Sequence, residues 1–422
     1  MIDLNRHYAE LLDRDDELAP LREQFVIADE DQLYMDGNSL GRLPRKAASR
    51  ALSLIEHEWG KELIGGWNGG WYEAPLRVGD TIGSLIGAAA GQVAVTDSTS
   101  VNLYKLVVAA LRLRPGRHRI VTDTLNFPSD YYIIQSAIDL LSAGHDLVRA
   151  ASRDGGVTPD LDELVRSIDS DTALIVLSHV AFRSGYLYDM QRITQAAHAE
   201  GALVIWDLSH SVGAVPIALD GCEADFAVGC TYKYLNGGPG APAFLYVHRT
   251  LQEAAASPIW GWFGREAPFS FDPNYAPATG IARFLAGTPP ILSLLTMEAA
   301  LEPTVHAGIA AIRRKSVSQT EYLIALIDTL LVPLGFELAS PRNPAQRGSH
   351  VSIRHQEGFR IAQALTAELN VIPDFREPDI IRFGCAPLYT KYTDIWETVQ
   401  RTRQVIVDRL FETYSATRHG VT

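Results

Sequence analysis

The amino-acid sequence predicts an α/β protein, with a large domain built on a mostly parallel sheet and a smaller α+β domain. Apolar, β-rich runs alternate with helical stretches through the middle of the chain, which is typical of parallel strands joined by crossover helices. The runs are continuously apolar, as expected for strands that are buried on both faces. The pattern changes near residues 287–294, where a long helical region begins before strands return.

The elements of the large domain follow from their local sequences. The expected strands are rich in β-branched and aliphatic residues and cover 118–123, 172–182, 202–207, 224–230 and 241–247. The expected helices between them have helical periodicity and stop at a glycine, and they cover 129–144 and 189–201. This order of elements predicts a parallel sheet with helices on its faces.

The second part of the chain predicts a separate, smaller unit. A long helical region at 291–331 is followed by two strand-like runs, 350–355 and 379–385, with a helix at 357–369 between them. We therefore divide the chain into three parts. They are an N-terminal segment that joins the small domain (1–55), a large cofactor-binding domain (56–294) and a small C-terminal domain (295–422).

Composition and charge restrict the class of protein. The formal net charge of −13 disfavours nucleic acid and anionic membrane surfaces, so we expect neither as a partner. Three cysteines without a CxxC spacing predict neither a disulfide framework nor a zinc site, and we expect no metal. The first residues lack the apolar stretch of a signal peptide, and no uncharged apolar run approaches the ~20 residues of a membrane helix. The expectation is a soluble, cytoplasmic protein.

Three polar residues stand where buried strands of the large domain end. Ser178 closes the run ALIVLS, Asp207 closes ALVIWD, and Lys233 follows ADFAVGCTY. In open α/β sheets, ligands bind outside the carboxyl ends of the strands. We therefore expect these three side chains to converge on one crevice.

An amine placed in such a crevice suits a Schiff base with pyridoxal 5′-phosphate (PLP). The pyridine nitrogen of PLP needs an anion to stay protonated, and Asp207 stands 26 residues before Lys233. His210, three residues after Asp207, is a second candidate to hold the cofactor.

The phosphate and the ring of PLP make two further demands. A phosphate binds at a helix N-terminus with hydroxyl groups, and Ser98, Thr99 and Ser100 precede an amphipathic helical stretch. The ring needs an apolar or aromatic wall, for which Phe127 is the candidate, with Asp130 as its polar neighbour.

Each of these residues also has a simpler explanation. A lysine between two tyrosines often lies along the protein surface. An aspartate at a strand end, or a Ser/Thr cluster before a helix, often only caps a turn or a helix. The lone His210 is more often structural. The conjunction of these groups, in chain order at successive strand ends, favours the cofactor site.

At these residues the chain resembles the kynureninases, which are PLP-dependent enzymes of fold type I in the aminotransferase class V group. The resemblance covers nearly the whole chain and keeps the order of the family's motifs. These motifs are YMDGNSLG (34–41), DSTSVNL (97–103), NFPSD (126–130), SHVAFRSG (178–185), CTYKYLNGGPG (230–240), GWFG (261–264), GTPPIL (287–292) and IRFGCAPLY (381–389). The combination of DGNSLG, YKYLNGGPG and GWFG is far more specific than an isolated Asp…Lys pair.

The resemblance implies hydrolysis of L-kynurenine to anthranilate and L-alanine in the kynurenine pathway, with 3-hydroxykynurenine as a second candidate substrate. It leaves open whether the reaction serves tryptophan catabolism or NAD biosynthesis. By this resemblance Lys233 holds PLP and moves protons, Tyr232 is a candidate proton donor, and Arg382 binds the substrate α-carboxylate. The residues implied to hold the cofactor are Thr99, Ser100, Phe127, Pro128, Ser129, Asp130, Ser178, Asp207, His210, Tyr232, Lys233, Trp262 and Thr288.

Substrate choice and assembly are also implied by the resemblance. Trp262 and Thr288 match positions that contact the phosphate from a neighbouring subunit, so we expect a homodimer with shared active sites. Trp67, interpreted as facing the aryl pocket, and the pair Gly287-Thr288 fit a preference for kynurenine over 3-hydroxykynurenine. Trp67 is equally compatible with a place in the core.

The residues leave other functions open. A cysteine desulfurase or selenocysteine lyase shares the Asp…Lys framework but needs a reactive cysteine on a mobile loop. An aminotransferase of the same fold would hydrolyse its intermediate without breaking a carbon–carbon bond. A non-catalytic binding module of this fold is a third alternative, against which the retained Lys233, Asp207 and Arg382 argue.

Overall fold

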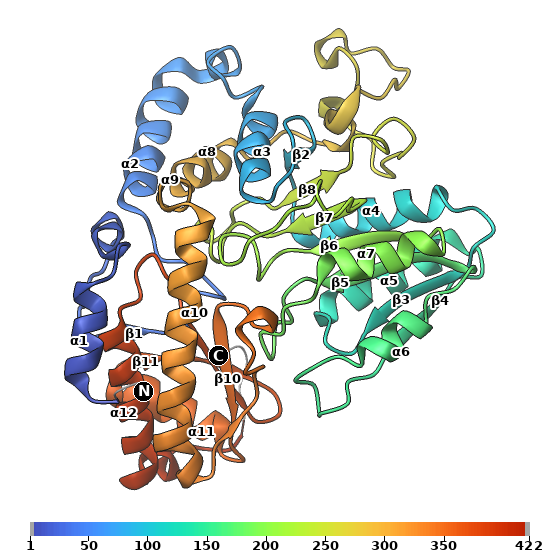
Figure 1. Cartoon of the computed structure of the whole chain (residues 1–422). Coiled ribbons are helices and arrows are strands. Elements are labelled where there is room, and N and C mark those ends of the chain that lie inside the picture. Colours follow the sequence, from blue (N-terminus) through green and yellow to red (C-terminus); the bar gives the residue numbers. More distant parts are fainter. Residues whose placement is uncertain (1–3, 418–422) are drawn as a thin grey trace.

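A seven-stranded sheet forms the centre of the large domain in the computed structural model, which describes residues 4–417 (Figure 1). Its strands are β2 (Val93–Val95), β3 (Arg119–Asp123), β4 (Asp146–Ala150), β5 (Thr172–Ser178), β6 (Leu203–Asp207), β7 (Phe226–Gly229) and β8 (Phe244–Val247). They lie in the order β2-β8-β7-β6-β5-β3-β4. The pairs that involve β8 are antiparallel and the other pairs are parallel. The predicted α/β class with a mostly parallel sheet is therefore confirmed.

Helices cover both faces of this sheet (Figure 1). They are α3 (Ala74–Leu85), α4 (Thr99–Arg112), α5 (Pro128–Leu141), α6 (Leu161–Arg166) and α7 (Met190–Ala199). Successive side chains of a strand point to opposite faces. Leu203 and Ile205 of β6 therefore pack in one hydrophobic cluster with α4 and α5, while Val204 and Trp206 pack in another with α3 and α7. Full burial of such a side chain stabilises the fold by about 1.5–3 kcal/mol, which is why these strands have no polar face.

The remaining elements form the small domain and the segments that join it to the sheet. The helices are α1 (Arg6–Arg14), α2 (Arg45–Ser53), α8 (Ile291–Ala300), α9 (Glu302–Ala307), α10 (Ile309–Leu326), α11 (Gly358–Leu369) and α12 (Tyr392–Val407). The strands are β1 (Leu33–Tyr34), β9 (Glu337–Leu338), β10 (His350–Arg354), β11 (Val371–Ile372), β12 (Asp374–Arg376) and β13 (Ile380–Gly384).

The small domain is a four-stranded antiparallel sheet, in the order β12-β13-β10-β9, packed against α10, α11 and α12 (Figure 1). The N-terminal part of the chain belongs to this unit by its contacts, because α1 packs on α12 and β1 pairs with β11. The next helix, α2, packs instead against α8. The N-terminal segment thus reaches from the small domain to the large one.

The observed boundaries differ from the predicted ones where single residues change the backbone. The helix expected to end at Gly144 ends at Leu141, because Ser142 adopts a left-handed conformation (φ 49°) and its N–H bonds the Ile138 carbonyl. The strand expected over 172–182 ends at Ser178. The long helical region at 291–331 is divided at two points, where α9 begins with Glu302 followed by Pro303 and where Gly308 (φ 71°) precedes α10.

One helical stretch, Ile309–Leu334, is long and apolar enough by length and composition to cross a membrane. Several of its apolar residues lie in the core of the small domain, where Leu323, Leu326 and Ile327 are fully buried. Packing inside the protein therefore explains much of the hydrophobicity of this stretch.

Two adjacent ion pairs join α10 to the segment after α1, and they differ in burial. The Nζ atom of Lys315 lies 2.6 Å from Asp16 Oδ2, with both side chains 6% exposed. The Nη2 atom of Arg314 lies 2.7 Å from Glu17 Oε1, with side chains 64% and 58% exposed. A buried charge that loses its partner is costly, whereas an exposed pair in water contributes little.

We expect Asp16→Ala to lower the free energy of unfolding by about 3–5 kcal/mol, because it leaves Lys315 buried without its main counter-charge. Glu17→Ala, the matched control one residue away, should cost less than about 1 kcal/mol. Urea denaturation of the two variants measures both values. Equal losses would contradict the role of burial.

Candidate active site

The carboxyl ends of the central strands bring three of the predicted residues together. Ser178 and Asp207 are the last paired residues of β5 and β6, so they lie side by side at the edge of the sheet. Lys233 follows β7, and its Nζ atom lies 2.8 Å from Nε2 of His210. His210 comes from the turn that follows β6. An amine, an imidazole and a carboxylate therefore meet at one point.

Two buried carboxyl groups face the amine of Lys233. Burial raises the pKa of Asp207, and the charge of Lys233 opposes this rise. Both hydrogen bonds that Asp207 accepts, from the N–H (2.8 Å) and the hydroxyl (2.6 Å) of Ser209, use Oδ1. Burial raises the pKa of Asp130 as well, and the negative charge of Asp207 adds to this effect. Such carboxyl groups favour a cationic partner.

The N-terminus of α4 offers a phosphate site. Thr99 is the first residue of this 14-residue helix and Ser98 is its N-cap, with Ser98 Oγ accepting from the N–H of Val101 at 3.4 Å. The first N–H groups of a helix have no intrahelical partners and bind anions. Ser100 Oγ lies 3.2 Å from Ser129 Oγ, so a second helix start contributes a hydroxyl here.

The turn before α4 is held by a buried ion pair. Lys105 Nζ contacts Asp97 Oδ2 at 2.5 Å and donates to the Phe284 carbonyl at 2.7 Å. Asp97 has a positive φ of 47°, which is uncommon for a residue with a side chain. The ion pair fixes the turn that aims the start of α4 at the site.

An aromatic side chain stands at the start of α5. Phe127 is the N-cap of α5, Pro128 is the first residue of the helix, and Asp130 lies in its first turn. The Phe127 ring is 39% exposed, and its edge contact with Phe182 has a centroid distance of 5.1 Å. An exposed face of this ring can stack on a planar ligand.

Tyr232 lies beside the amine. Lys233 Nζ is 5.9 Å from the centroid of the Tyr232 ring. The neighbouring Cys230 thiol, followed by burial, raises the pKa of the Tyr232 hydroxyl. The phenol therefore keeps its proton at neutral pH and can donate it.

Arg382 on β13 uses most of its guanidinium N–H groups in contacts with its own chain. Its guanidinium forms a 2.5 Å ion pair with Asp374 Oδ2, and both side chains are at most 2% exposed. It also donates to Ser39 Oγ at 2.9 Å and to the Phe182 carbonyl. With its amide oxygen turned to the guanidinium, Asn38 accepts from Nε at 3.2 Å.

Several residues that contact these groups were not singled out from the sequence. Asn126 accepts from both the N–H (3.1 Å) and the hydroxyl (2.6 Å) of Ser178 and thereby fixes the end of β5. Asn38 and Ser39 hold Arg382, and His350 lies near His210 with a ring-centroid distance of 5.7 Å. The motifs NFPSD and DGNSLG contain Asn126, Asn38 and Ser39, so these three residues could have been identified from the sequence. His350 lies outside the motifs, so no sequence pattern indicated it.

Three predicted residues form a second group by their own contacts. Trp262 Nε1 donates to Thr288 Oγ1 at 3.3 Å, and the rings of Trp262 and Trp67 meet edge to face with a centroid distance of 6.2 Å. Trp67 also contacts Trp71 and Phe263. Thr288 is exposed and Trp67 is partly buried, so both expectations for Trp67, core and pocket wall, stay open.

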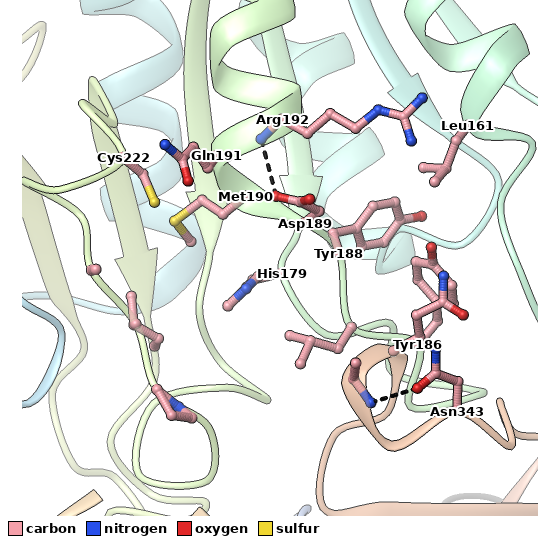
Figure 2. A pocket seen from close by; sticks show the side chains of 16 residues that line it. Leu161, His179, Tyr186, Tyr188, Asp189, Met190, Gln191, Arg192, Cys222 and Asn343 are labelled. Carbon is pink, nitrogen blue, oxygen red and sulfur yellow. Dashed lines mark hydrogen bonds between the residues drawn. The ribbon is translucent and has the colours of Figure 1, made fainter. Parts of the chain in front are cut away.

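A cavity of about 570 Å³ lies elsewhere, between the loop after β5, the start of α7 and residues 343–346 (Figure 2). Figure 2 shows His179, Met190 and Cys222 among its sixteen lining residues, none of which is a predicted site residue. Burial lowers the pKa of His179 to about 4, so this imidazole is neutral. His179 directly follows Ser178, and its N–H donates to the Asp207 carbonyl at 2.8 Å. The cavity thus borders the site but does not contain its chemistry.

The residues at the strand ends fit PLP. Oδ2 of Asp130 has no hydrogen-bond partner among residues 4–417, and Asp207 keeps Oδ2 for a donor such as a protonated ring nitrogen. The amine of Lys233, the start of α4 and the ring of Phe127 suit the aldehyde, the phosphate and the ring face respectively.

Solved structures share this fold. The apo cysteine desulfurase from Thermococcus onnurineus NA1 superposes with a TM-score of 0.78 at 18% identity, covering 92% of this chain and 98% of that one. A mutant of C-DES with glycine covalently linked to its PLP cofactor has a TM-score of 0.76 at 17% identity, covering 93% and 99%. At such low identity these structures show the fold alone. The fold of this chain is therefore fold type I of the PLP-dependent enzymes.

The sequence comparisons identify the family to which the chain belongs within this class of fold. The chain is 46% identical over 406 residues to a kynureninase from Burkholderia pseudomallei, covering 95% of each chain. It is 45% identical over 417 residues to a kynureninase from Pseudomonas fluorescens, covering 97% of this chain and 98% of that one. Residues 312–402 match the family model of the kynureninase C-terminal domain. The chain belongs to the kynureninase family, which confirms the resemblance stated from its motifs.

A pH effect follows from Asp36, which lies near Asp374 and Arg382. Burial, followed by the charge of Asp374, raises the pKa of Asp36 to about 6 from its ordinary 3.8. The folded protein therefore binds more protons than the unfolded chain between pH 4 and 6, so the free energy of unfolding falls as pH rises through this window.

We expect Asp36→Asn to unfold less readily than the unaltered protein at pH 8, by up to about 3 kcal/mol, with the difference shrinking toward pH 4. Urea denaturation at several pH values measures it. Asp29 is the control of opposite sign, because a hydrogen bond from Asn370 lowers its pKa, so Asp29→Asn should lose stability at pH 8. A difference in the free energy of unfolding between Asp36→Asn and the unaltered protein that does not depend on pH would contradict the raised pKa of Asp36.

Proposed function

We propose that this protein hydrolyses L-kynurenine to anthranilate and L-alanine, with PLP held by Lys233. The observation that carries this is the placement of the Lys233 amine at 2.8 Å from His210, next to buried Asp207, in a chain of the kynureninase family. PLP supplies an aldehyde that condenses with amines and a ring that accepts electrons from the carbon next to the substrate amino group.

Different residues of the chain hold different parts of the cofactor. Asp207 would accept the ring N–H and keep that nitrogen protonated, while the start of α4, with Thr99, Ser100 and Ser129, would hold the phosphate. Phe127 would lie against the ring face. The site also takes in Ser178, which Asn126 fixes at the sheet edge.

The substrate is oriented through its carboxylate, and Lys233 and Tyr232 transfer protons to and from its carbon atoms. Arg382 attracts the α-carboxylate at the junction of the domains. The Lys233 amine takes the proton from the α-carbon. Water adds to the carbonyl beside the aryl ring, and the bond between the β- and γ-carbons breaks. The oxygen of that water ends in the carboxylate of anthranilate. The Tyr232 hydroxyl supplies a proton to the β-carbon and Lys233 returns one to the α-carbon, which completes alanine.

The same residues argue against sulfur chemistry, although the solved structures of this fold include cysteine desulfurases. A desulfurase needs a cysteine that ionises easily. Burial raises the pKa of Cys222 and of Cys230, and it raises that of Cys385 to about 12. All three thiols of the chain are therefore poor nucleophiles.

We also propose a cytoplasmic homodimer with active sites at the subunit interface, with a preference for kynurenine over its 3-hydroxy form. Large apolar side chains are exposed over two segments, 52–72 and 260–271, which fits an interface. They are Leu52, Ile55, Trp59, Leu63, Ile64, Tyr72, Trp260, Phe269 and Phe271. Trp262 and Thr288 lie beside this surface, where they can serve the active site of the other subunit.

Lys233→Ala should lower anthranilate formation from L-kynurenine by at least about a thousandfold, because it removes the amine that meets His210 at the strand ends. Anthranilate fluorescence and alanine release measure the reaction. Borohydride treatment of the PLP-loaded protein should label residue 233, and Lys46→Ala, which removes an exposed lysine, should change neither result. Full turnover by Lys233→Ala, or a label elsewhere, would refute the proposal.

Tyr232→Phe should lower turnover by about 10²–10⁴-fold while PLP remains bound, because only the proton-donating hydroxyl is lost. Steady-state kinetics and the absorbance of the bound cofactor check the two statements separately. Unchanged turnover would exclude Tyr232 as the proton donor.

A further inference from the structure

His350 is a fully buried histidine whose ring nitrogens, Nδ1 and Nε2, both lack a hydrogen-bond partner in the part of the chain that the structure describes. A neutral imidazole has one N–H donor and one acceptor. Leaving such a group unsatisfied costs about 1–3 kcal/mol, and buried polar groups in folded proteins nearly always have a partner. The ring of His350 is therefore placed for a partner that residues 4–417 do not supply.

The small sheet puts His350 on the same face as Arg382. In the antiparallel pair of β10 and β13, His350 stands opposite Gly384, and Ser352 stands opposite Arg382. Residues opposite each other, and residues two apart along one strand, share a face of a sheet. The imidazole and the guanidinium are thus neighbours on the face that meets the large domain.

The surroundings of the ring leave room for it and keep it neutral. A side chain at Gly185 would approach Nε2 of His350 to 3.2 Å, so the absence of one makes space for the ring. Burial, followed by the charges of Arg382 and Lys233, holds the pKa of His350 well below its usual value. The ring therefore has a single N–H in the range where enzymes work.

Arg382 by itself has few free N–H groups with which to bind a carboxylate. Its contacts with Asp374, Ser39, Phe182 and Asn38 use four of the five guanidinium N–H groups, counted over residues 4–417. One N–H of Nη1 remains. A carboxylate has two oxygens that both accept hydrogen bonds, so a second donor is needed beside the guanidinium.

We propose that His350 donates a hydrogen bond to the α-carboxylate of the amino-acid substrate, beside Arg382, and thereby sets the affinity of the site for amino acids. This deepens the proposed function and rests on it. A residue kept only to fill space at this position would be favoured as an apolar side chain, because an unsatisfied buried imidazole destabilises the fold.

The test compares two nearly isosteric variants in the PLP-loaded protein. His350→Gln keeps an N–H donor and His350→Met removes it. The probes are L-alanine and ethylamine, which have an amine in common but of which only alanine has a carboxylate. Titration followed by the cofactor absorbance gives the dissociation constants and requires no turnover, so its outcome is independent of whether kynurenine is cleaved.

His350→Met should weaken L-alanine binding about tenfold or more, as expected for one hydrogen bond to a charged group, and leave ethylamine binding unchanged. His350→Gln should bind alanine within about threefold of the unaltered protein. His179→Met, which removes a different buried neutral imidazole in the lining of the cavity of Figure 2, should leave both constants unchanged. If the Met variant does not fold, the isosteric pair His350→Asn and His350→Leu makes the same comparison. Alanine binding that is unaffected by loss of the donor, or equal losses for both probes, would overturn the proposal.

Discussion

The parallel strands β5, β6 and β7 must end at the same edge of the sheet, and the chemistry of this protein depends on that constraint. It sets Ser178 next to Asp207 in the strand register and brings Lys233 to the same edge a few residues after β7. A shift of one residue along β6 would turn the Asp207 side chain to the opposite face of the sheet. The continuous apolar packing on both faces fixes the register, and the site follows from it.

Burial of charge at that edge makes the site reactive and also makes it dependent on partners. Asp207 and Asp130 are buried and lie close to the partly buried Lys233, so the charge of each carboxyl group is costly unless the lysine offsets it. Arg382 extends this cluster to the small domain. Its guanidinium touches Ser39 in the N-terminal segment, Phe182 in the large domain and Asp374 in the small domain. In the proposed function, substrate recognition by Arg382 is thereby tied to the relative position of three segments.

The same fold supports different reactions because the groups around the cofactor differ. Cysteine desulfurases superpose on nearly the whole chain, although the identity to the one from Thermococcus onnurineus is only 18%. In this protein the three thiols are held in environments that raise the pKa of each. Tyr232, by contrast, lies next to Lys233 with its proton retained. In the proposed function, the shared fold positions the cofactor, and the side chains around the cofactor determine which bond of the substrate breaks.

The sequence by itself determined the class of fold, the strand ends and the family, because apolar runs, glycine stops and motifs such as DGNSLG are local signals. It also named Lys233, Asp207 and Arg382. Only the tertiary structure decided the partners of these residues. Asp374 and His350 lie on strands that become neighbours of Arg382 through sheet pairing, and His350 meets His210 across the junction of the domains. Contacts between residues far apart in the chain leave no local sequence pattern. The burial of His350 on β10, and its lack of a hydrogen-bond partner, could therefore be recognised only from the tertiary structure.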